Sequence, residues 1–360
     1  MLKTAKTPDY SLVGRDTLTA VQQGLANGEW YQSPVPRAKL KELMKRSDGP
    51  ALRDTAIWIA ALVASGAGIV YFWGTWWVVP FLLVYGALYG SSGDSRWHEC
   101  GHGTAFKTRW MNDVVYQIAS FMIVRNPTLW RWSHTRHHTD TYIIGHDPEI
   151  VGMRPPNLVK WLGFFVGITD VPLLFYAMIR HAAGTVSPDE ATFVPVSERP
   201  KVYWTARIWT VIYIAVIVSC FWMQSILPAM LIGLPAFYGA WLKIVFGLTQ
   251  HVGLEDNVLD HRLNTRTVYM NPLLRFMYWN MNYHVEHHMF PMVPYHALPQ
   301  LHEAIKNDCP PPYRSLWEAY TEIVPTVLRQ RRDPDYKIHR PLPPGAGKTP
   351  IPVPPAATAA

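Results

Sequence analysis

The sequence predicts an all-α integral membrane protein in which two transmembrane helical hairpins, with four spans, support a cytosolic helical cap that carries a two-metal site. Only 16% of the 360 residues are charged, compared with about 25% in an average soluble domain. Charged residues are absent between Asp54 and Asp94 and between Arg207 and Lys243, and each gap is about twice as long as one membrane-spanning helix. Eight of the 15 histidines fall in three short clusters, which predict the metal site.

The composition excludes several other classes of protein. A hydrophobic share of 49% excludes a disordered or fibrous chain, and three widely spaced cysteines do not indicate a disulfide framework. The net charge is +7, but the basic residues flank the apolar segments, so we expect them to face an anionic membrane surface and expect no nucleic-acid partner. The N-terminal residues contain no apolar stretch typical of a cleaved signal peptide.

Each charge-free segment predicts one hairpin. Gly74 to Trp77 form the expected turn of the first hairpin, and Gln224 with Ser225 form that of the second. Neither turn contains Lys or Arg, whereas many basic residues flank the segments, so both hairpins should enter from and return to the cytosol. We expect a multi-pass protein with its polar part in the cytosol, in the inner membrane if the source is bacterial. The predicted spans cover about 55–73, 76–92, 205–223 and 226–248.

The remaining segments are assigned by composition. Residues 113–124 are too short to span a bilayer, and residues 158–179 are interrupted by Asp170 and Pro172. We expect both to lie in the interface or against the cytosolic part, because an odd number of spans would place the third histidine cluster on the wrong side. The predicted regions are a cytosolic N-terminal segment over 1–54 with a surface helix over 37–49, a main domain over 55–339 and a disordered Pro-rich tail over 340–360.

The three clusters read HECGH at 98–102, HTRHH at 134–138 and HVEHH at 284–288. On a helix, residues three and four apart share one face, so each cluster presents its imidazoles together. Imidazole suits Fe, Zn, Cu and Ni, and eight rings are more than one ion can hold, so two ions are expected. The candidate ligands are His98, His102, His134, His137, His138, His284, His287 and His288.

Further candidates surround these clusters. His251 ends the fourth predicted span on the same membrane face and is a candidate ninth ligand. Carboxylates near the clusters are expected to hold a ring N–H of a ligand in place; they are Glu99, Asp140, Asp147, Glu149 and Glu286. The isolated histidines are expected to be structural or at the surface; they are His146, His181, His261, His296, His302 and His339.

The series HECGH, HTRHH and HVEHH on two predicted hairpins resembles the membrane fatty-acid desaturase family, and NYHVEHHMFPMVPYHALPQLH is similar to the family's segment around the third box. The resemblance extends over about 48–328. It implies that the eight box histidines and His251 ligate two non-haem iron ions, that O2 is a co-substrate, and that a separate ferredoxin- or cytochrome b5-type donor supplies electrons at the bilayer. The third box differs from that of alkane hydroxylases. It begins with His284 where front-end desaturases have Gln, and no HPGG-type cytochrome b5 domain is present.

The resemblance predicts an O2-dependent desaturase of a fatty-acyl or lipid-like chain. Carotenoid or lipid hydroxylases and ketolases share comparable boxes and stay open as alternatives. So does a desaturase of a small amino-acid-like metabolite of the dihydrorhizobitoxine type, because GHDPEI at 145–150 is similar to that branch. A membrane zinc-binding or transport protein is disfavoured, since transport requires ionisable residues within the spans and none occurs before Lys243. A zinc hydrolase would leave most of the histidines unexplained.

Overall fold

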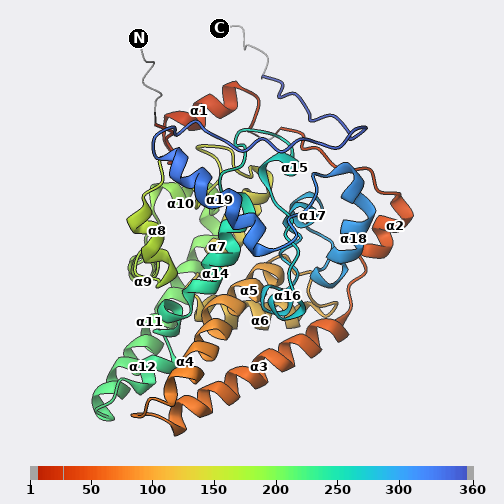
Figure 1. The fold of residues 1–360 in the computed structure, drawn as a ribbon. Coiled ribbons are helices and arrows are strands. Elements are labelled where there is room, and N and C mark those ends of the chain that lie inside the picture. The colour runs from red at the N-terminus through yellow and green to blue at the C-terminus, as the bar shows by residue number, and fades with distance from the viewer. Residues whose placement is uncertain (1–6, 27, 355–360) are drawn as a thin grey trace.

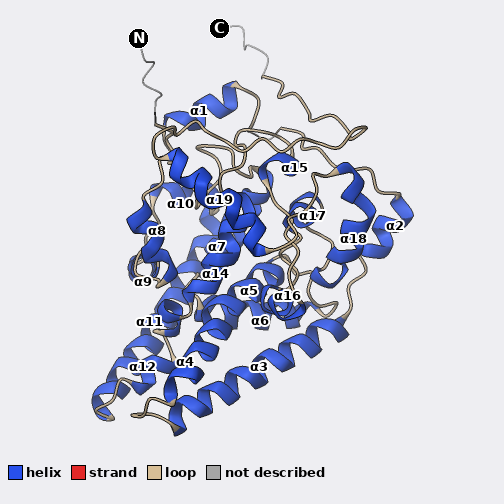
Figure 2. Ribbon diagram, viewed as in Figure 1, coloured by secondary structure: helices blue, strands red, loops and turns tan. Residues whose placement is uncertain are grey.

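The molecule is built from helices. The computed structural model describes residues 7–26 and 28–354 (Figure 1). Within these ranges no β-strand forms (Figure 2), and β-pairing there is limited to isolated bridges such as that between Leu254 and Ile338. The predicted all-α class is therefore confirmed.

Two helical hairpins extend to one end of the molecule, away from both termini (Figure 1). They contain α3 (Asp48–Tyr71) with α4 (Val78–Gly86), and α11 (Arg199–Trp222) with α12 (Leu227–Leu231). Helices α3 and α11 belong to stretches that are long and apolar enough to cross a membrane, and their most apolar windows are only 33% and 17% buried. Most of this apolar surface faces outward, as expected for contact with lipid.

The chain reverses at the tip of each hairpin through a residue with a left-handed backbone. Gly74 has φ +85 and Gln224 has φ +47. Beside Gly74, the Trp76 and Trp77 side chains are 90% and 72% exposed. Exposed tryptophan at a hairpin tip is typical of the boundary between the bilayer core and the headgroups.

The two returning segments differ from each other. Helix α4 continues without a break through the π-helix η1 (Ala87–Ser92) into α5 (Gly93–Gly101). The second return is divided among α12, α13 (Pro235–Tyr238) and α14 (Ala240–His251), which differs from the continuous helix predicted over 226–248. Pro228 and Pro235 lack the N–H that a continuous helix requires, and Gly233 has φ +98, which takes the chain out of helical geometry.

Glycines allow these two returning segments to touch. A Cβ atom on Gly239 would lie 2.0 Å from the carbonyl oxygen of Gly86. Only glycine, which has no side chain, therefore allows this contact. Next to it, the Ser91 hydroxyl donates to the Gly239 carbonyl at 2.6 Å and accepts from the Lys243 backbone N–H at 2.7 Å. The contact fixes α14 against the π-helix that leads into the first histidine cluster.

We therefore expect Gly239→Ala to destabilise the protein by about 1–3 kcal/mol or more, because the added methyl group meets backbone that cannot move aside. Gly247→Ala is the matched control, since a Cβ on Gly247 meets nothing within 4 Å. Thermal unfolding of both purified variants in detergent tests the prediction. Equal melting temperatures for the two variants would show that the contact is not tight.

The remaining helices form a cap at the other end of the molecule, between the hairpins and the termini (Figure 1). Helix α6 packs on α5, and α9 packs on α11, so the segments predicted at 113–124 and 158–179 lie against the helices that carry or adjoin the site. The cap helices are α1 (Arg15–Gln22), α2 (Arg37–Leu43), α6 (Arg109–Met122), α7 (Pro127–Thr139), α8 (Leu158–Phe165), α9 (Val171–Ala182), α10 (Pro188–Phe193), α15 (His261–Asn264), α16 (Pro272–Tyr278), α17 (His284–Met289), α18 (Leu298–Ile305) and α19 (Leu316–Gln330).

Two terminal segments differ from their sequence-based descriptions. The predicted surface helix over 37–49 ends earlier, with α2, because α3 begins at Asp48, whose carboxylate accepts from the Thr108 N–H and hydroxyl at 2.8 Å each. Residues 340–354, predicted to be disordered, contact the cap. The Gly347 N–H donates to Asp308 at 2.8 Å, and the Thr349 hydroxyl donates to Asp260 at 2.7 Å. Residues 355–360 lie outside the described residues.

Candidate metal centre

Four helices bring the three histidine clusters together. The first cluster lies on α5 and on His102, the residue that caps its C-terminal end, the second on α7, and the third on α17, while His251 is the last residue of α14. Local sequence sets the start of α7, where Pro127 occupies the first turn and the Asn126 side chain accepts from the N–H groups of Thr128 and Leu129. Such a cap fixes where the helix begins, and therefore which residues of HTRHH point inward.

One group of ligand atoms contains five histidines whose nitrogens all lie within 4.8 Å of one another. The Nε2 atom of His134 lies 3.1 Å from that of His102 and 3.2 Å from that of His138, which lies 3.2 Å from the Nε2 of His287. Imidazoles that share one ion at about 2.0–2.1 Å stand about this far apart. The group consists of His98, His102, His134, His138 and His287.

The second group contains His137, His251 and His288 within the same 4.8 Å limit. His284 adjoins it, with its Nε2 atom 3.1 Å from that of His288 and its ring centroid 5.1 Å from that of His251. The two groups touch, since the rings of His138 and His288 stack with centroids 4.3 Å apart. All nine histidines predicted as ligands therefore lie in two adjoining groups of five and four.

Hydrogen bonds at Nδ1 direct the Nε2 atoms of several rings into these groups. The Nδ1 atom of His137 lies 2.9 Å from both carboxylate oxygens of Asp147, and that of His134 lies 3.0 Å from Glu149. The Nδ1 atom of His251 lies 2.8 Å from the backbone carbonyl of Asn264. Because these acceptors require a proton on Nδ1, the Nε2 atoms carry lone pairs, the form in which imidazole binds a metal.

The converging ring nitrogens favour a cation between them. Nε2 atoms that lie 3.1–3.2 Å apart cannot all act as donors and acceptors to one another, because each neutral ring has one N–H. The Nε2 atom of His251 is buried and has no hydrogen-bond partner in the described part of the chain. A metal ion between the rings would satisfy these atoms, so the residues present fit two ions with imidazole ligands.

The burial of the histidine groups favours neutral rings. Burial, followed by the neighbouring imidazoles, lowers the pKa of seven rings well below the usual value, namely His98, His102, His138, His251, His284, His287 and His288. His137 differs: burial alone would lower its pKa, but the charge of Asp147 and the hydrogen bond to it raise the pKa. Burial would raise the pKa of Glu149, yet His134 lowers it to about 2.

The other candidate carboxylates contact groups outside the ligand set. Glu99 accepts from the Thr104 hydroxyl at 2.7 Å and from the Tyr295 N–H at 3.0 Å, and burial raises its pKa to about 7. Glu286 lies 2.5 Å from Nδ1 of His302, and Asp140 lies 3.6 Å from His146. These side chains stabilise the cap around the boxes, which differs from the expectation that they hold a ligand ring.

Three residues next to the ligands were not predicted from the sequence as their neighbours. The Asn264 carbonyl orients His251, and the Thr141 hydroxyl lies 3.1 Å from Nδ1 of His288. The buried His261 ring lies 5.1 Å from the His288 ring and stacks on Trp30 at 4.2 Å, outside both ligand groups. A backbone carbonyl leaves no signal in a sequence, whereas His261 stands in DHRLN, ten positions after His251.

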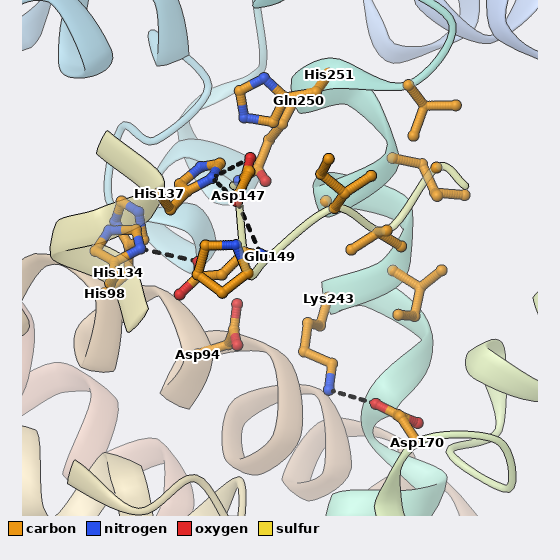
Figure 3. A pocket seen from close by; sticks show the side chains of 18 of the residues that line it. Asp94, His98, His134, His137, Asp147, Glu149, Asp170, Lys243, Gln250 and His251 are labelled. Carbon is orange, nitrogen blue, oxygen red and sulfur yellow. Dashed lines mark hydrogen bonds and ion pairs between the residues drawn. The ribbon is translucent and has the colours of Figure 1, made fainter. Parts of the chain in front are cut away.

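A cavity of about 340 Å³ opens beside both groups (Figure 3). His98 and His134 of the first group and His137, His251 and His284 of the second line one part of it. Trp97 and Trp130 also line the cavity, as do the apolar α14 side chains Ile244 and Leu248. A substrate in this cavity would therefore lie directly against the candidate metal centre.

The fold and site define a helical protein with two helices that could span a membrane and with histidine boxes that could bind metal ions. A sequence model of the Fatty acid desaturase family matches residues 74–320, more than half of the chain. The protein belongs to the fatty acid desaturase family, which confirms the resemblance seen in its histidine boxes.

Named relatives are plant desaturases at low identity. An omega-3 fatty acid desaturase of the Ricinus communis chloroplast is 26% identical over 58% of this chain and 49% of its own length. The Arabidopsis thaliana acyl-lipid omega-3 desaturase (cytochrome b5) of the endoplasmic reticulum is 23% identical over 77% of this chain and 72% of its own length. An Arabidopsis sn-2 acyl-lipid omega-3 desaturase (ferredoxin) is 26% identical over 71% and 60%. The match thus spans about half of the first relative.

Proposed function

We propose that the protein is an O2-dependent desaturase that introduces a double bond into a fatty-acyl or lipid-like chain at a histidine-ligated di-iron centre. The observation that supports this proposal is the convergence of nine buried or half-buried histidines in two adjoining groups beside one cavity. The family and the desaturase names of the relatives support the same reaction.

Each group of histidines would hold one iron ion. The group of five around His134 would hold the first, and the group of four around His251 would hold the second. Iron supplies the O2 and one-electron chemistry that side chains cannot. Burial favours the neutral form of seven of the ligand rings, while Asp147 and Glu149 fix the orientation of two others.

The reaction balances only with an external donor. Two hydrogens leave neighbouring carbons of the substrate, and two electrons and two protons from outside complete the reduction of O2 to two waters. One relative is named for cytochrome b5 and another for ferredoxin. We propose that a separate donor of one of these types supplies the electrons at the cap.

We also propose a four-span arrangement in the membrane. The hairpins α3–α4 and α11–α12 would insert side by side, with the cap and both termini on the cytosolic side. The two outward-facing apolar helices and the absence of Lys and Arg from the tips support this orientation. In a bacterium the membrane would be the inner one.

Metal and product analysis test the proposed function together. The purified protein should contain about two irons per chain, and chelation that removes them should abolish activity, which iron should restore. In a host that supplies acyl substrates, mass spectrometry should show a product two mass units lighter than the substrate. One zinc and no iron would contradict the proposal, and a gain of sixteen mass units would indicate hydroxylation instead.

A further inference from the structure

Lys243 is one of the charged side chains in the cavity that are neither metal ligands nor carboxylate partners of the ligands. Lys243 follows a stretch of 35 residues, 208–242, that contains no charge, and the residue is only 8% exposed. From its position late in an apolar segment, the sequence predicts that its long side chain extends to the membrane surface. In the structure the ammonium instead points into the cavity toward Asp170 (Figure 3).

The Lys243 ammonium is only partly satisfied. Its Nζ atom lies 3.3 Å from Oδ2 of Asp170, and this is its one hydrogen bond within the described residues. An ammonium has three N–H donors, so two remain for another acceptor. The other carboxylate oxygen of Asp170 is buried without a partner in the same part of the chain. A largely buried ammonium with two unused N–H donors is typical of a functional site.

Other charges that line the cavity are engaged, at least in part, by neighbouring side chains, although the Nε atom of Arg125 is also buried without a partner in the described residues. Arg125 donates to Asp94 at 2.7 Å, and its guanidinium lies over the rings of Trp97 and Trp130 at 4.8 and 4.6 Å. Glu149 and Asp147 hold ligand histidines. Lys243 therefore offers free cationic donors to a molecule in this cavity, and the contact of Ser91 with its backbone N–H holds its helix in register.

We infer that Lys243 binds an oxyanion at the polar end of the substrate, a carboxylate or a phosphate, and so selects a short amphiphilic acid. This inference rests on the proposed function. Apolar side chains such as Ile244 and Leu248 line the wall along α14, so a short hydrocarbon segment would lie there and reach the histidine groups. The volume of about 340 Å³ lies near the lower limit for pockets that enclose small ligands.

Binding of matched ten-carbon probes to the full-length, iron-loaded protein in detergent tests this inference by calorimetry. Decanoate should bind at least about tenfold more tightly than methyl decanoate or decylammonium, because a charge-assisted hydrogen bond is lost in the neutral ester and reversed in the amine. Decyl phosphate, which has the same single ten-carbon chain, distinguishes the two oxyanions: preference for it over decanoate would indicate a phosphate. If the unaltered protein binds decanoate and its methyl ester equally, this result alone would overturn the inference.

Lys243→Met should reduce the affinity of the preferred acid by about tenfold or more and leave binding of the methyl ester unchanged. Lys201→Met is the matched control, since Lys201 forms an exposed ion pair with Glu198. If the methionine variant folds poorly, Lys243→Arg is the alternative variant, and it should retain acid binding. Unchanged acid affinity in a folded Lys243→Met protein would contradict the role of Lys243.

The two proposals can fail separately. Lys243-dependent acid binding without any product two mass units lighter would contradict the desaturase and leave the oxyanion site in place. A desaturated product with no preference for acids over esters would support the desaturase and contradict the oxyanion site at Lys243.

Discussion

Replacement of His137 by alanine is expected to reduce desaturation by more than about a hundredfold and to lower the iron content from about two ions per chain to about one. His137 belongs to the group that contains His251 and His288, and its Nδ1 atom is held by Asp147. Loss of a hydrogen-bond partner of a metal ligand already costs about 10–100-fold, so loss of the ligand itself should cost more. Product mass spectrometry and metal analysis of the purified variant measure the two effects.

His339→Ala is the matched control for this substitution. His339 is a histidine outside both groups, with a side chain that is 74% exposed and paired with Glu255. This variant should retain activity and both ions. Membrane insertion should be unchanged in both variants, because neither residue lies in a predicted span. A His137→Ala protein with full activity and two irons would contradict the assignment of the second group.

The histidine centre could be predicted from the sequence to an unusual extent because helical spacing determines it. Three clusters with spacings of three and four place their rings on single helix faces, and the charge-free segments predict that those helices lie on one side of the predicted spans. His251 could be predicted from its position at the end of an apolar segment, on the same side as the clusters.

Other features could not be predicted because they depend on contacts between distant segments. The π-helix over Ala87–Ser92 contains no distinctive residue pattern, and its Ser91 contacts Gly239 and Lys243 across 148 and 152 positions of the chain. Of the carboxylates near the boxes, Asp147 reaches a ligand, whereas Glu286 reaches His302. Proximity in sequence could not distinguish these outcomes, because each depends on where a loop or a neighbouring helix lies.

Asp147→Asn is expected to reduce activity and the affinity for the second iron by about 10–100-fold while the fold is retained. The carboxylate accepts from the Tyr142 N–H at 2.7 Å and the Glu149 N–H at 2.8 Å as well as from His137. An amide offers one oxygen in place of two and turns an N–H₂ group toward a donor. Without the negative charge, the pKa of His137, which Asp147 raises, should fall, and the ring should become a weaker ligand.

Iron titration of the metal-free variant separates this effect from general destabilisation, because only one of the two binding events should weaken. Asp113→Asn is the matched control: its carboxylate forms an exposed ion pair with Arg131 at 3.4 Å, and such pairs contribute about 0–1 kcal/mol. Equal weakening of both iron sites would indicate a loosened cap. Unchanged affinity and activity would show that the backbone N–H groups of Tyr142 and Glu149, and not His137, are the reason for a carboxylate at this position.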